Sequence, residues 1–295
     1  MVFLNFIVML SQAFLENLSN LLELKIEHIH SVSGGDISSA YLIETSSEKY
    51  FLKVNSDIDA GEMFKSEAKA LKLIAKTNTI ATPKVYACDS FRNDSFLLME
   101  YIEPKRASSE DLKLFGQQLA QLHQVTSDEF GFESNNFIGS LHQSNNKHKL
   151  WIDFYIEERL IPQLHLAKSK GLLNDSEFPE MGKMKEDCSI YFKDVNPSLL
   201  HGDLWSGNYL ISESGKPYLI DSATYFGHSE VDIAMSKLFG GFGQSFYDSY
   251  HKIIPKDNFT DSRIELYQLF YLLVHLNIFG SSYYFSVKGL LKKYF

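Results

Sequence analysis

The residues best suited to catalysis lie in one short stretch of the chain, HGDLWSGN at positions 201–208. Asp203 and Asn208 are five residues apart, and Asp221 follows thirteen residues after Asn208. This order suits phosphoryl transfer, in which one carboxylate takes the proton of an acceptor hydroxyl while an amide and a second carboxylate hold Mg2+ on ATP. We therefore predict Asp203 as the catalytic base, and Asn208 and Asp221 as the Mg2+ ligands. Because Gly, Asn and Asp also favour ordinary tight turns, this interpretation requires that the other residues of a kinase active site are present upstream.

A lysine and a glutamate upstream supply two of those parts. Lys53 lies within the apolar, aromatic-rich run KYFLKV (49–54), which predicts a strand, and burial of an unpaired ammonium there would be costly. Glu67 follows fourteen residues later, inside a pattern of helical period over residues 61–76. The two residues fit the strand-lysine to helix-glutamate ion pair that positions the phosphates of ATP.

Two further segments are candidates for nucleotide binding. The sequence SVSGGD (31–36) lies between candidate strands at 25–30 and 37–44, where a phosphate-covering hairpin belongs. Gly34 and Gly35 would let its backbone approach phosphate, although the full G-x-G-x-x-G motif is missing and an ordinary glycine turn is the alternative. The backbone of Glu100, Tyr101 and Ile102, at the end of the last predicted strand, is where we expect adenine to bind.

The surrounding elements divide the chain into two predicted lobes. Residues 1–102 form short β-rich runs around one strong helix, and residues 103–295 form mainly helical patterns. We predict an α+β, bilobal fold like that of protein kinases, with an N-terminal ATP-binding lobe (1–102) and a C-terminal catalytic and substrate-binding lobe (103–295). Predicted helices of the second lobe include one capped by Ser109 and one over 151–168, and a hairpin over 209–220 should bring the two catalytic loops together.

Composition and charge are those of a globular protein. The 295 residues are 44% hydrophobic and carry a net charge of −9, which argues against a nucleic-acid partner. The chain has two cysteines, Cys88 and Cys188, too few for a disulfide scaffold, so we expect the reducing cytoplasm. The apolar residues 1–10 lack the basic flank and cleavage site of a secretory signal and are too short to span a bilayer. Met9 is an alternative first residue.

The motifs taken together resemble the fructosamine kinase (ketosamine-3-kinase) family, relatives of the aminoglycoside and choline phosphotransferases. The resemblance covers about residues 10–283, and the tryptophan in HGDLWSGN is its most distinctive mark. The other segments that carry it are LIDSATYFGHSEVDIAM (219–235), LFGGF (238–242), GQQLAQLH (116–123), FGF (130–132), NFIG (136–139), Gln143, Trp151, Arg159, PQ (162–163), LYQL (266–269) and HLNIFG (275–280).

The resemblance implies a reaction. ATP would phosphorylate the 3-hydroxyl of a ribulosamine, erythrulosamine or fructosamine adduct of an amine or protein, and the unstable product would release the amine, phosphate and a 3-deoxyosone. Some family members carry a redox-active cysteine in the phosphate loop that links two subunits. Residues 31–36 contain no cysteine, so we expect no such switch, and a monomer or a weak non-covalent dimer without a membrane partner.

Four further residues lie near these candidate catalytic residues. We expect His201 to brace the loop rather than to transfer protons, because Asp203 already serves as base. Asp232 is expected to cap a helix or to brace the loop. Trp205 and His228 are candidate substrate contacts. The alternatives are a core aromatic packed under the loop for Trp205 and a satisfied structural histidine for His228.

Other functions remain open at this point. A small-molecule kinase with another acceptor, such as an aminoglycoside or choline, would share the same catalytic residues. A pseudokinase that binds nucleotide without turnover is disfavoured because Lys53, Glu67, Asp203, Asn208 and Asp221 are all present. A protein kinase is disfavoured because Asp221 is followed by Ser-Ala, and because no A-P-E segment frames an activation loop.

Overall fold

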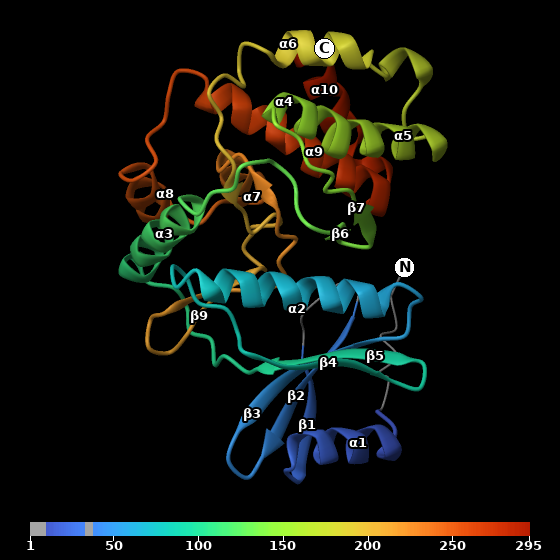
Figure 1. Cartoon of the computed structure of the whole chain (residues 1–295), viewed down its shortest axis with the longest axis vertical. Coiled ribbons are helices and arrows are strands. Elements are labelled where there is room, and N and C mark those ends of the chain that lie inside the picture. The colour runs from blue at the N-terminus through green and yellow to red at the C-terminus, as the bar shows by residue number, and fades with distance from the viewer. Residues whose placement is uncertain (1–9, 33–37) are drawn as a thin grey trace. The chain divides into compact units, whose positions relative to one another are not determined.

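The computed structural model describes residues 10–32 and 38–295, which form two compact units (Figure 1). One unit comprises the chain up to Lys72 together with Pro83–Glu103, and the other comprises Leu73–Thr82 together with Pro104–Phe295. Gly34 and Gly35, the candidate phosphate-loop glycines, lie outside the described residues. Among the residues described, none of the helices is both long and apolar enough to span a bilayer.

The first unit is built on an antiparallel sheet of five strands. They are β1 (Ile26–Val32), β2 (Ser39–Thr45), β3 (Lys49–Asn55), β4 (Val85–Phe91) and β5 (Asp94–Glu100), in the spatial order β1-β2-β3-β5-β4 (Figure 1). The first three follow the runs that the sequence predicts at 25–30, 37–44 and 49–54, with ends shifted by at most two residues. Such runs of β-branched and aromatic residues suit a half-buried pleated surface.

Each face of this sheet is covered by one helix. Helix α1 (Gln12–Leu22) begins after its N-cap Ser11, and its Phe14 and Leu18 pack with Leu52 of β3. Helix α2 (Ala60–Lys76) packs instead on Leu97, Met99 and Phe51. Since side chains alternate along a strand, Lys53 shares the face of Phe51 and therefore points towards α2.

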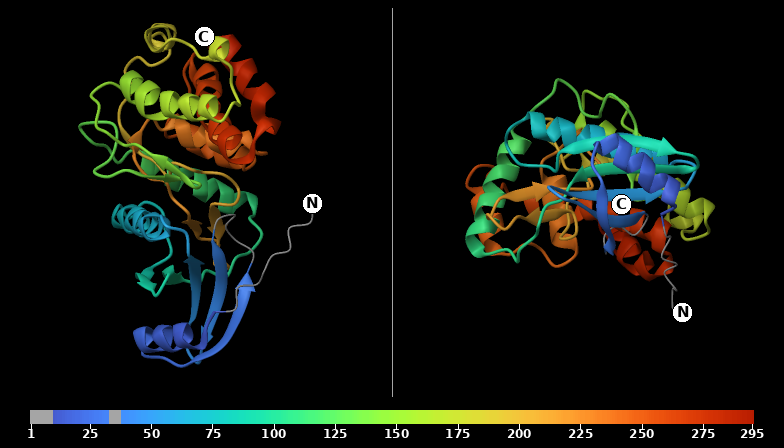
Figure 2. Two further views of the ribbon diagram at one scale, coloured as in Figure 1. Left: turned by 90° about the vertical axis from the view of Figure 1, so that its right-hand side faces the viewer. Right: turned by 90° about the horizontal axis from the view of Figure 1, so that it is seen from below.

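The second unit is mainly helical. Its helices are α3 (Ser109–His123), α4 (Trp151–Phe154), η1 (Tyr155–Leu160), α5 (Ile161–Ser169), η2 (Asp175–Glu177), α6 (Met181–Cys188), α7 (Glu230–Leu238), α8 (Gln244–His251), α9 (Thr260–Phe279), η3 (Ser281–Tyr283) and α10 (Tyr284–Tyr294). Helices α3 and α8 pack together, as do α9 and α10 (Figure 2). The 20-residue α9 runs through the core and buries most of its side chains, including Leu266, Phe270 and Leu273.

Two predicted helices differ in detail. Ser108, not Ser109, is the N-cap of α3, where it forms a reciprocal capping box with Asp111. The helix predicted over 151–168 is present over Trp151–Ser169, but its central turn, η1, is a π-helix. The widened turn contains the fully buried Arg159, whose guanidinium lies 4.0 Å from the ring centre of Tyr225. Hydrophobic periodicity does not show such a local insertion.

Short strands hold the loops of the second unit in place. They are β6 (Asn136–Ile138), β7 (Leu141–Gln143), β8 (Ser198–Leu199), β9 (Tyr209–Ile211), β10 (Pro217–Leu219) and β11 (Phe226–Gly227). Strands β9 and β10 pair as the predicted hairpin, and β8 pairs with β11. The segment 200–208 therefore starts at one strand pair and ends at the other, which fixes both of its ends.

Candidate active site

The lysine and the glutamate of the first unit form an ion pair. Lys53 Nζ lies 2.8 Å from Glu67 Oε1, and both side chains are largely buried. Strand β3 turns Lys53 towards α2, and the helix presents Glu67 one turn after Phe64, which packs on the same face of the sheet. The pair gives the buried ammonium a partner, without which its burial would be costly. The candidate catalytic residues of the loop at 201–208 belong to the other unit.

In the second unit, the side chain of Asn208 closes the loop at 201–208 by contacting Asp203. The Asn208 amide nitrogen donates to the Asp203 carbonyl oxygen (2.8 Å) and to Asp203 Oδ2 (3.2 Å). Because the amide nitrogen faces Asp203, the amide oxygen of Asn208 is left to face another group. Asn208 is 95% buried (5% exposed), whereas Asp203 is half-buried. The spacing of five residues thus brings the two side chains into contact.

Asp221 follows strand β10 and is held beside the same loop. The backbone N–H of its neighbour Ile220 donates to the Asn208 carbonyl (3.1 Å), and the Ile220 carbonyl accepts from His201 Nε2 (2.7 Å). Asp221 itself has a φ of 56°. This left-handed conformation is uncommon for residues other than glycine, and strain of this kind concentrates at functional sites.

The electrostatics of the loop reflect two neighbouring carboxylates. Burial, with the charge of Asp221 as the next cause, raises the pKa of Asp203 to about 7. The hydrogen bond from Asn208 acts in the opposite direction, since it favours the charged form. The site therefore concentrates negative charge, which a divalent cation would neutralise.

His201 braces the loop through both of its ring nitrogens. Its Nε2–H donates to the Ile220 carbonyl, so Nδ1 is left to accept from the backbone N–H of Asp203 at 3.2 Å. Burial lowers the pKa of His201, which keeps the ring neutral. A neutral ring satisfies both contacts at once, whereas a protonated ring could not accept from Asp203. These contacts favour the bracing role expected from the sequence.

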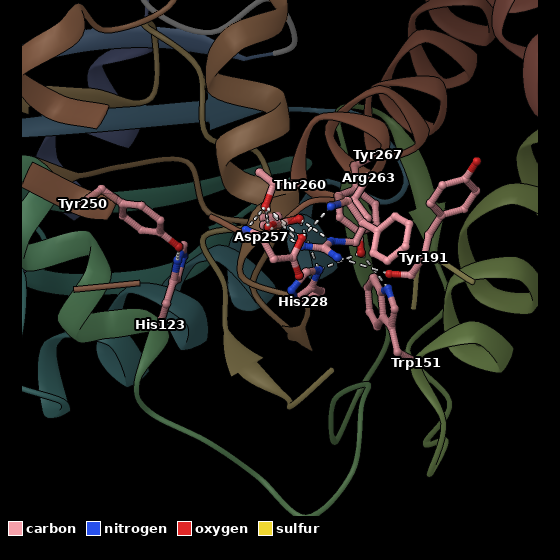
Figure 3. Close-up of polar contacts among 11 residues, drawn as sticks. His123, Trp151, Tyr191, His228, Tyr250, Asp257, Thr260, Arg263 and Tyr267 are labelled. Carbon is pink, nitrogen blue, oxygen red and sulfur yellow. Dashed lines mark hydrogen bonds and ion pairs between the residues drawn. The ribbon is translucent and has the colours of Figure 1, made fainter. Parts of the chain in front are cut away.

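Asp232 anchors the loop at 201–208 through hydrogen bonds to its backbone. Its carboxylate accepts from the backbone N–H groups of His201 (2.7 Å) and Gly202 (2.9 Å) and from His123 Nε2 (3.0 Å). Burial alone would raise the pKa of Asp232, but these donors hold it below its usual value. His123 in turn contacts the Tyr250 hydroxyl at 2.7 Å (Figure 3). Asp232 thus braces the loop, and it does not cap α7, whose N-cap residue is Ser229.

Gly202 is the point where the loop passes closest to its neighbours. It has a φ of 87°, and a Cβ there would lie 2.1 Å from the Ala223 carbonyl oxygen. The Tyr271 hydroxyl of α9 donates to the Gly202 carbonyl at 2.8 Å. Only glycine fits this position, since any side chain would clash with backbone.

The Trp205 side chain lies on the surface of the loop. It is 36% exposed, and its ring lies over Gly207, where a Cβ would come within 2.5 Å of the indole. The alternative of a core aromatic packed under the loop is therefore wrong. The exposed ring remains a candidate contact for a substrate.

His228 belongs to a buried polar network instead (Figure 3). Trp151 Nε1 donates to the Tyr267 hydroxyl (2.9 Å), which leaves the hydroxyl proton for His228 Nδ1 (2.7 Å). Nearby, Arg263 pairs with Glu230 at 2.6 Å. Burial lowers the pKa of His228 to about 4. These contacts favour a structural role for His228 over a contact with a sugar hydroxyl.

This network predicts a pH dependence of stability. In the unfolded chain a histidine takes up its proton near pH 6.5, whereas the folded chain keeps His228 neutral down to about pH 4. The free energy of unfolding should therefore fall as the pH decreases through this window, by up to about 1.4 kcal/mol per pH unit from this residue. Urea unfolding of wild type and His228→Gln at pH 7 and pH 5 measures the difference. Equal losses in both proteins would contradict the assignment.

The candidate adenine segment has a regular backbone. Glu100 donates its N–H to the Lys84 carbonyl (2.8 Å), and Tyr101 donates to the Lys49 carbonyl (3.4 Å). Ile102, the next residue, follows the end of β5 and is buried. The segment is thus held by its neighbours up to Tyr101.

Neither cysteine has the setting of a reactive thiol. Cys88 lies within β4 and is half-buried, while Cys188 ends α6 and is fully buried. Burial raises the pKa of both thiols, that of Cys188 to about 12. Reactive thiols need an accessible, electropositive setting that lowers the pKa.

We therefore predict that activity is the same after dithiothreitol or mild peroxide, and that non-reducing gels show mainly monomer. Activity assays and gels on the treated protein test this directly. Reversible oxidative inactivation with a covalent dimer, lost in Cys88→Ser or Cys188→Ser, would overturn the prediction.

Comparison with known proteins places this chain in a family. The fructosamine kinase family model matches residues 10–295. A ketosamine-3-kinase of Mus musculus is 37% identical over 279 residues, covering 85% of this chain and 89% of that protein. A chloroplastic protein-ribulosamine 3-kinase of Arabidopsis thaliana is 37% identical over 276 residues, covering 92% of this chain and 83% of that protein.

Solved structures agree with this placement. A structure from Haemophilus somnus 129PT, assigned as a fructosamine-3-kinase, has a TM-score of 0.84 and 30% identity and covers 95% of each chain. An aminoglycoside phosphotransferase has a TM-score of 0.63 at 15% identity over 95% of this chain and 98% of its own, which shows a shared fold alone. The predicted α+β, protein-kinase-like fold is confirmed. The chain belongs to the fructosamine kinase family.

Proposed function

We propose that this chain is an ATP-dependent kinase that phosphorylates the 3-hydroxyl of ketosamines, the ribulosamine, erythrulosamine or fructosamine adducts of amines. The observation that carries the proposal is the contact of Asp203 with Asn208 beside Asp221, in a chain whose family and relatives are ketosamine kinases. In this proposal residues 1–102 form the ATP-binding lobe and residues 103–295 the catalytic lobe. The exposed Trp205 is the candidate contact for the sugar.

In the proposed reaction, the 3-hydroxyl oxygen of the ketosamine bonds to the γ-phosphorus as the bond to the β–γ bridging oxygen breaks. Asp203 accepts the hydroxyl proton, and ADP leaves with the bridging oxygen. A base is most effective when its pKa lies near the working pH. Burial, which raises the pKa of Asp203, moves the carboxyl in that direction.

The residues present fit Mg2+. Magnesium takes oxygen ligands, commonly one or two protein groups together with phosphate oxygens. Asp221 offers a carboxylate. The amide nitrogen of Asn208 faces Asp203, so its amide oxygen is available as the second ligand. When bound, Mg2+ would neutralise charge on the phosphate oxygens. Lys53, oriented by Glu67, would contribute a positive charge to the ATP phosphates. Gly34, Gly35 and Glu100–Ile102 would contact phosphate and adenine through their backbone.

The product of this reaction breaks down by itself. Enolisation of the ketosamine 3-phosphate towards C1 places the phosphate in an allylic position, from which it leaves. Hydrolysis of the resulting iminium releases the amine and a 3-deoxyosone. The proposed role is therefore repair of glycated amines, for which we propose the cytoplasm as the location.

A panel of acceptors tests the proposal. ATP consumption should be highest with ribuloselysine or fructoselysine and near background with an aminoglycoside or choline. Higher turnover of the aminoglycoside or choline would replace the proposal with the alternative acceptor class. No turnover of any acceptor by protein that still binds ATP would favour the pseudokinase.

A further inference from the structure

Four aromatic side chains of the second unit form a half-open cluster, which we call the aromatic box: Phe239, His275, Phe279 and Tyr283. The His275 ring lies at the centre, with ring-centroid distances of 4.8 Å to Phe239, 5.4 Å to Phe279 and 5.1 Å to Tyr283. Phe239 is 38% exposed and Phe279 is 53% exposed. Clusters of large aromatic rings are uncommon on the surface of a soluble protein, and such exposed apolar patches often mark a binding site.

His275 and Phe279 lie on α9, Tyr283 lies in η3, and Phe239 follows the end of α7; both α7 and α9 contact the loop at 201–208. Tyr271 of α9 donates to the Gly202 carbonyl, next to Asp203, and His275 follows one helical turn later, about 6 Å along the axis. Phe239 directly follows α7, whose Asp232 binds the N–H groups of the same loop. Both helices therefore connect the box rigidly to the proposed base.

The polar atoms of His275 have defined roles. Its Nδ1–H donates to the Tyr271 carbonyl at 2.7 Å, because a carbonyl can only accept. Burial lowers the pKa of His275, so the ring is neutral and Nε2 carries a lone pair. Within the described part of the chain this nitrogen has no hydrogen-bond partner. The box thus combines aromatic faces with one fixed hydrogen-bond acceptor.

That combination suits a ligand that is both a cation and a hydrogen-bond donor. Aromatic faces attract ammonium groups, and a neutral imidazole nitrogen accepts from an N–H. On the basis of the proposed function, we propose that the aromatic box is the subsite for the protonated amine nitrogen of the ketosamine. A free ketose carries the same hydroxyl groups as a ketosamine but has no amine nitrogen. By binding that nitrogen, the box would distinguish the ketosamine from the free ketose.

Steady-state kinetics with matched acceptors test this subsite. The acceptors are ribuloselysine and an analogue in which an ether oxygen replaces the amine nitrogen. His275→Leu should raise KM for ribuloselysine about tenfold or more, the effect of losing a hydrogen bond to a charged group. Values of kcat and of KM for ATP should not change, since His275 touches neither the base nor the nucleotide. KM for the ether analogue should be the same in both proteins.

Further variants separate recognition from packing. Phe279→Leu keeps an apolar side chain but removes the aromatic face, and it should raise KM for ribuloselysine alone. His275→Gln offers an amide oxygen in place of Nε2 and should recover part of the affinity. Phe285→Leu, at an aromatic side chain that is 81% exposed and outside the box, is the matched control and should behave as wild type. Equal KM changes for both acceptors, or none for either, would overturn the subsite.

Direct binding keeps this result distinct from the proposed function. A 3-deoxy ribuloselysine cannot be phosphorylated, so its calorimetric Kd reports the subsite without turnover. Weaker binding to His275→Leu, with unchanged melting of the variant, supports the box. The aromatic-box proposal alone is overturned if wild type phosphorylates ribuloselysine but His275→Leu binds the 3-deoxy compound as tightly as wild type does. Wild type that phosphorylates no ketosamine overturns both proposals.

Discussion

Asp221→Ala should abolish phosphoryl transfer while leaving the fold intact. Asp221 supplies the one carboxylate among the two proposed Mg2+ ligands, so its loss leaves the phosphate charge without a held cation. The fold should persist because Asp221 is half-buried and because the backbone of Ile220 makes the hydrogen bonds to Asn208 and His201. Loss of the left-handed aspartate also removes one source of repulsion from Asp203.

The measurement is ATP turnover with ribuloselysine at saturating Mg2+, alongside circular dichroism and thermal melting. Asp248→Ala is a suitable control, because it removes a carboxylate from α8, where Asp248 contacts Gln244 rather than the loop. This variant should keep wild-type activity. Substantial activity of wild type in excess EDTA would sink the metal assignment, as would turnover by Asp221→Ala.

Asp203→Asn should lower kcat by roughly 10²–10⁴, the range for a positioned proton acceptor. The amide has the shape of the carboxylate but cannot accept the hydroxyl proton. ATP binding should change little, because the proposed role of the carboxylate is at the acceptor hydroxyl and not at the nucleotide. Single-turnover kinetics and nucleotide titrations measure the two effects separately.

The same variant should be more stable than wild type. The pKa of Asp203 is raised in the folded chain, so above about pH 7 its ionised form costs stability relative to the unfolded chain. Replacing it with a neutral amide removes that cost, and the melting temperature should rise at pH 8. A normal kcat would refute the role of Asp203 as base, and a lower melting temperature would refute the electrostatic account.

The sequence predicts well those parts of the fold that depend on local periodicity. Alternation along residues 49–54 is enough to place Lys53 on the same face as Phe51, and helical spacing over 61–76 places Glu67 opposite it. The pairing of β9 with β10 follows from two short apolar runs and a turn. In each case the contacts lie close in sequence, so the pattern itself carries the geometry.

The sequence does not predict the contacts that join distant elements. His123 and Tyr250 both support Asp232, yet nothing in their local sequence indicates a partner more than 100 residues away. The exposure of Trp205 and the burial of His228 depend in the same way on which elements cover them. The π turn at η1 leaves no mark in hydrophobic period, because its apolar residues are buried on all sides. These features are determined by tertiary packing, which the local sequence around each residue does not show.

The anchoring of the loop by Asp232 also bears on the order in which the protein folds. The contacts of His123 with Asp232 and Tyr250 span 109 and 127 residues. Contacts of such large sequence separation form slowly, because a long stretch of chain must close before they are made. The catalytic loop therefore reaches its final shape only after α3, α7 and α8 have docked. During refolding, helical signal should return first and enzymatic activity last.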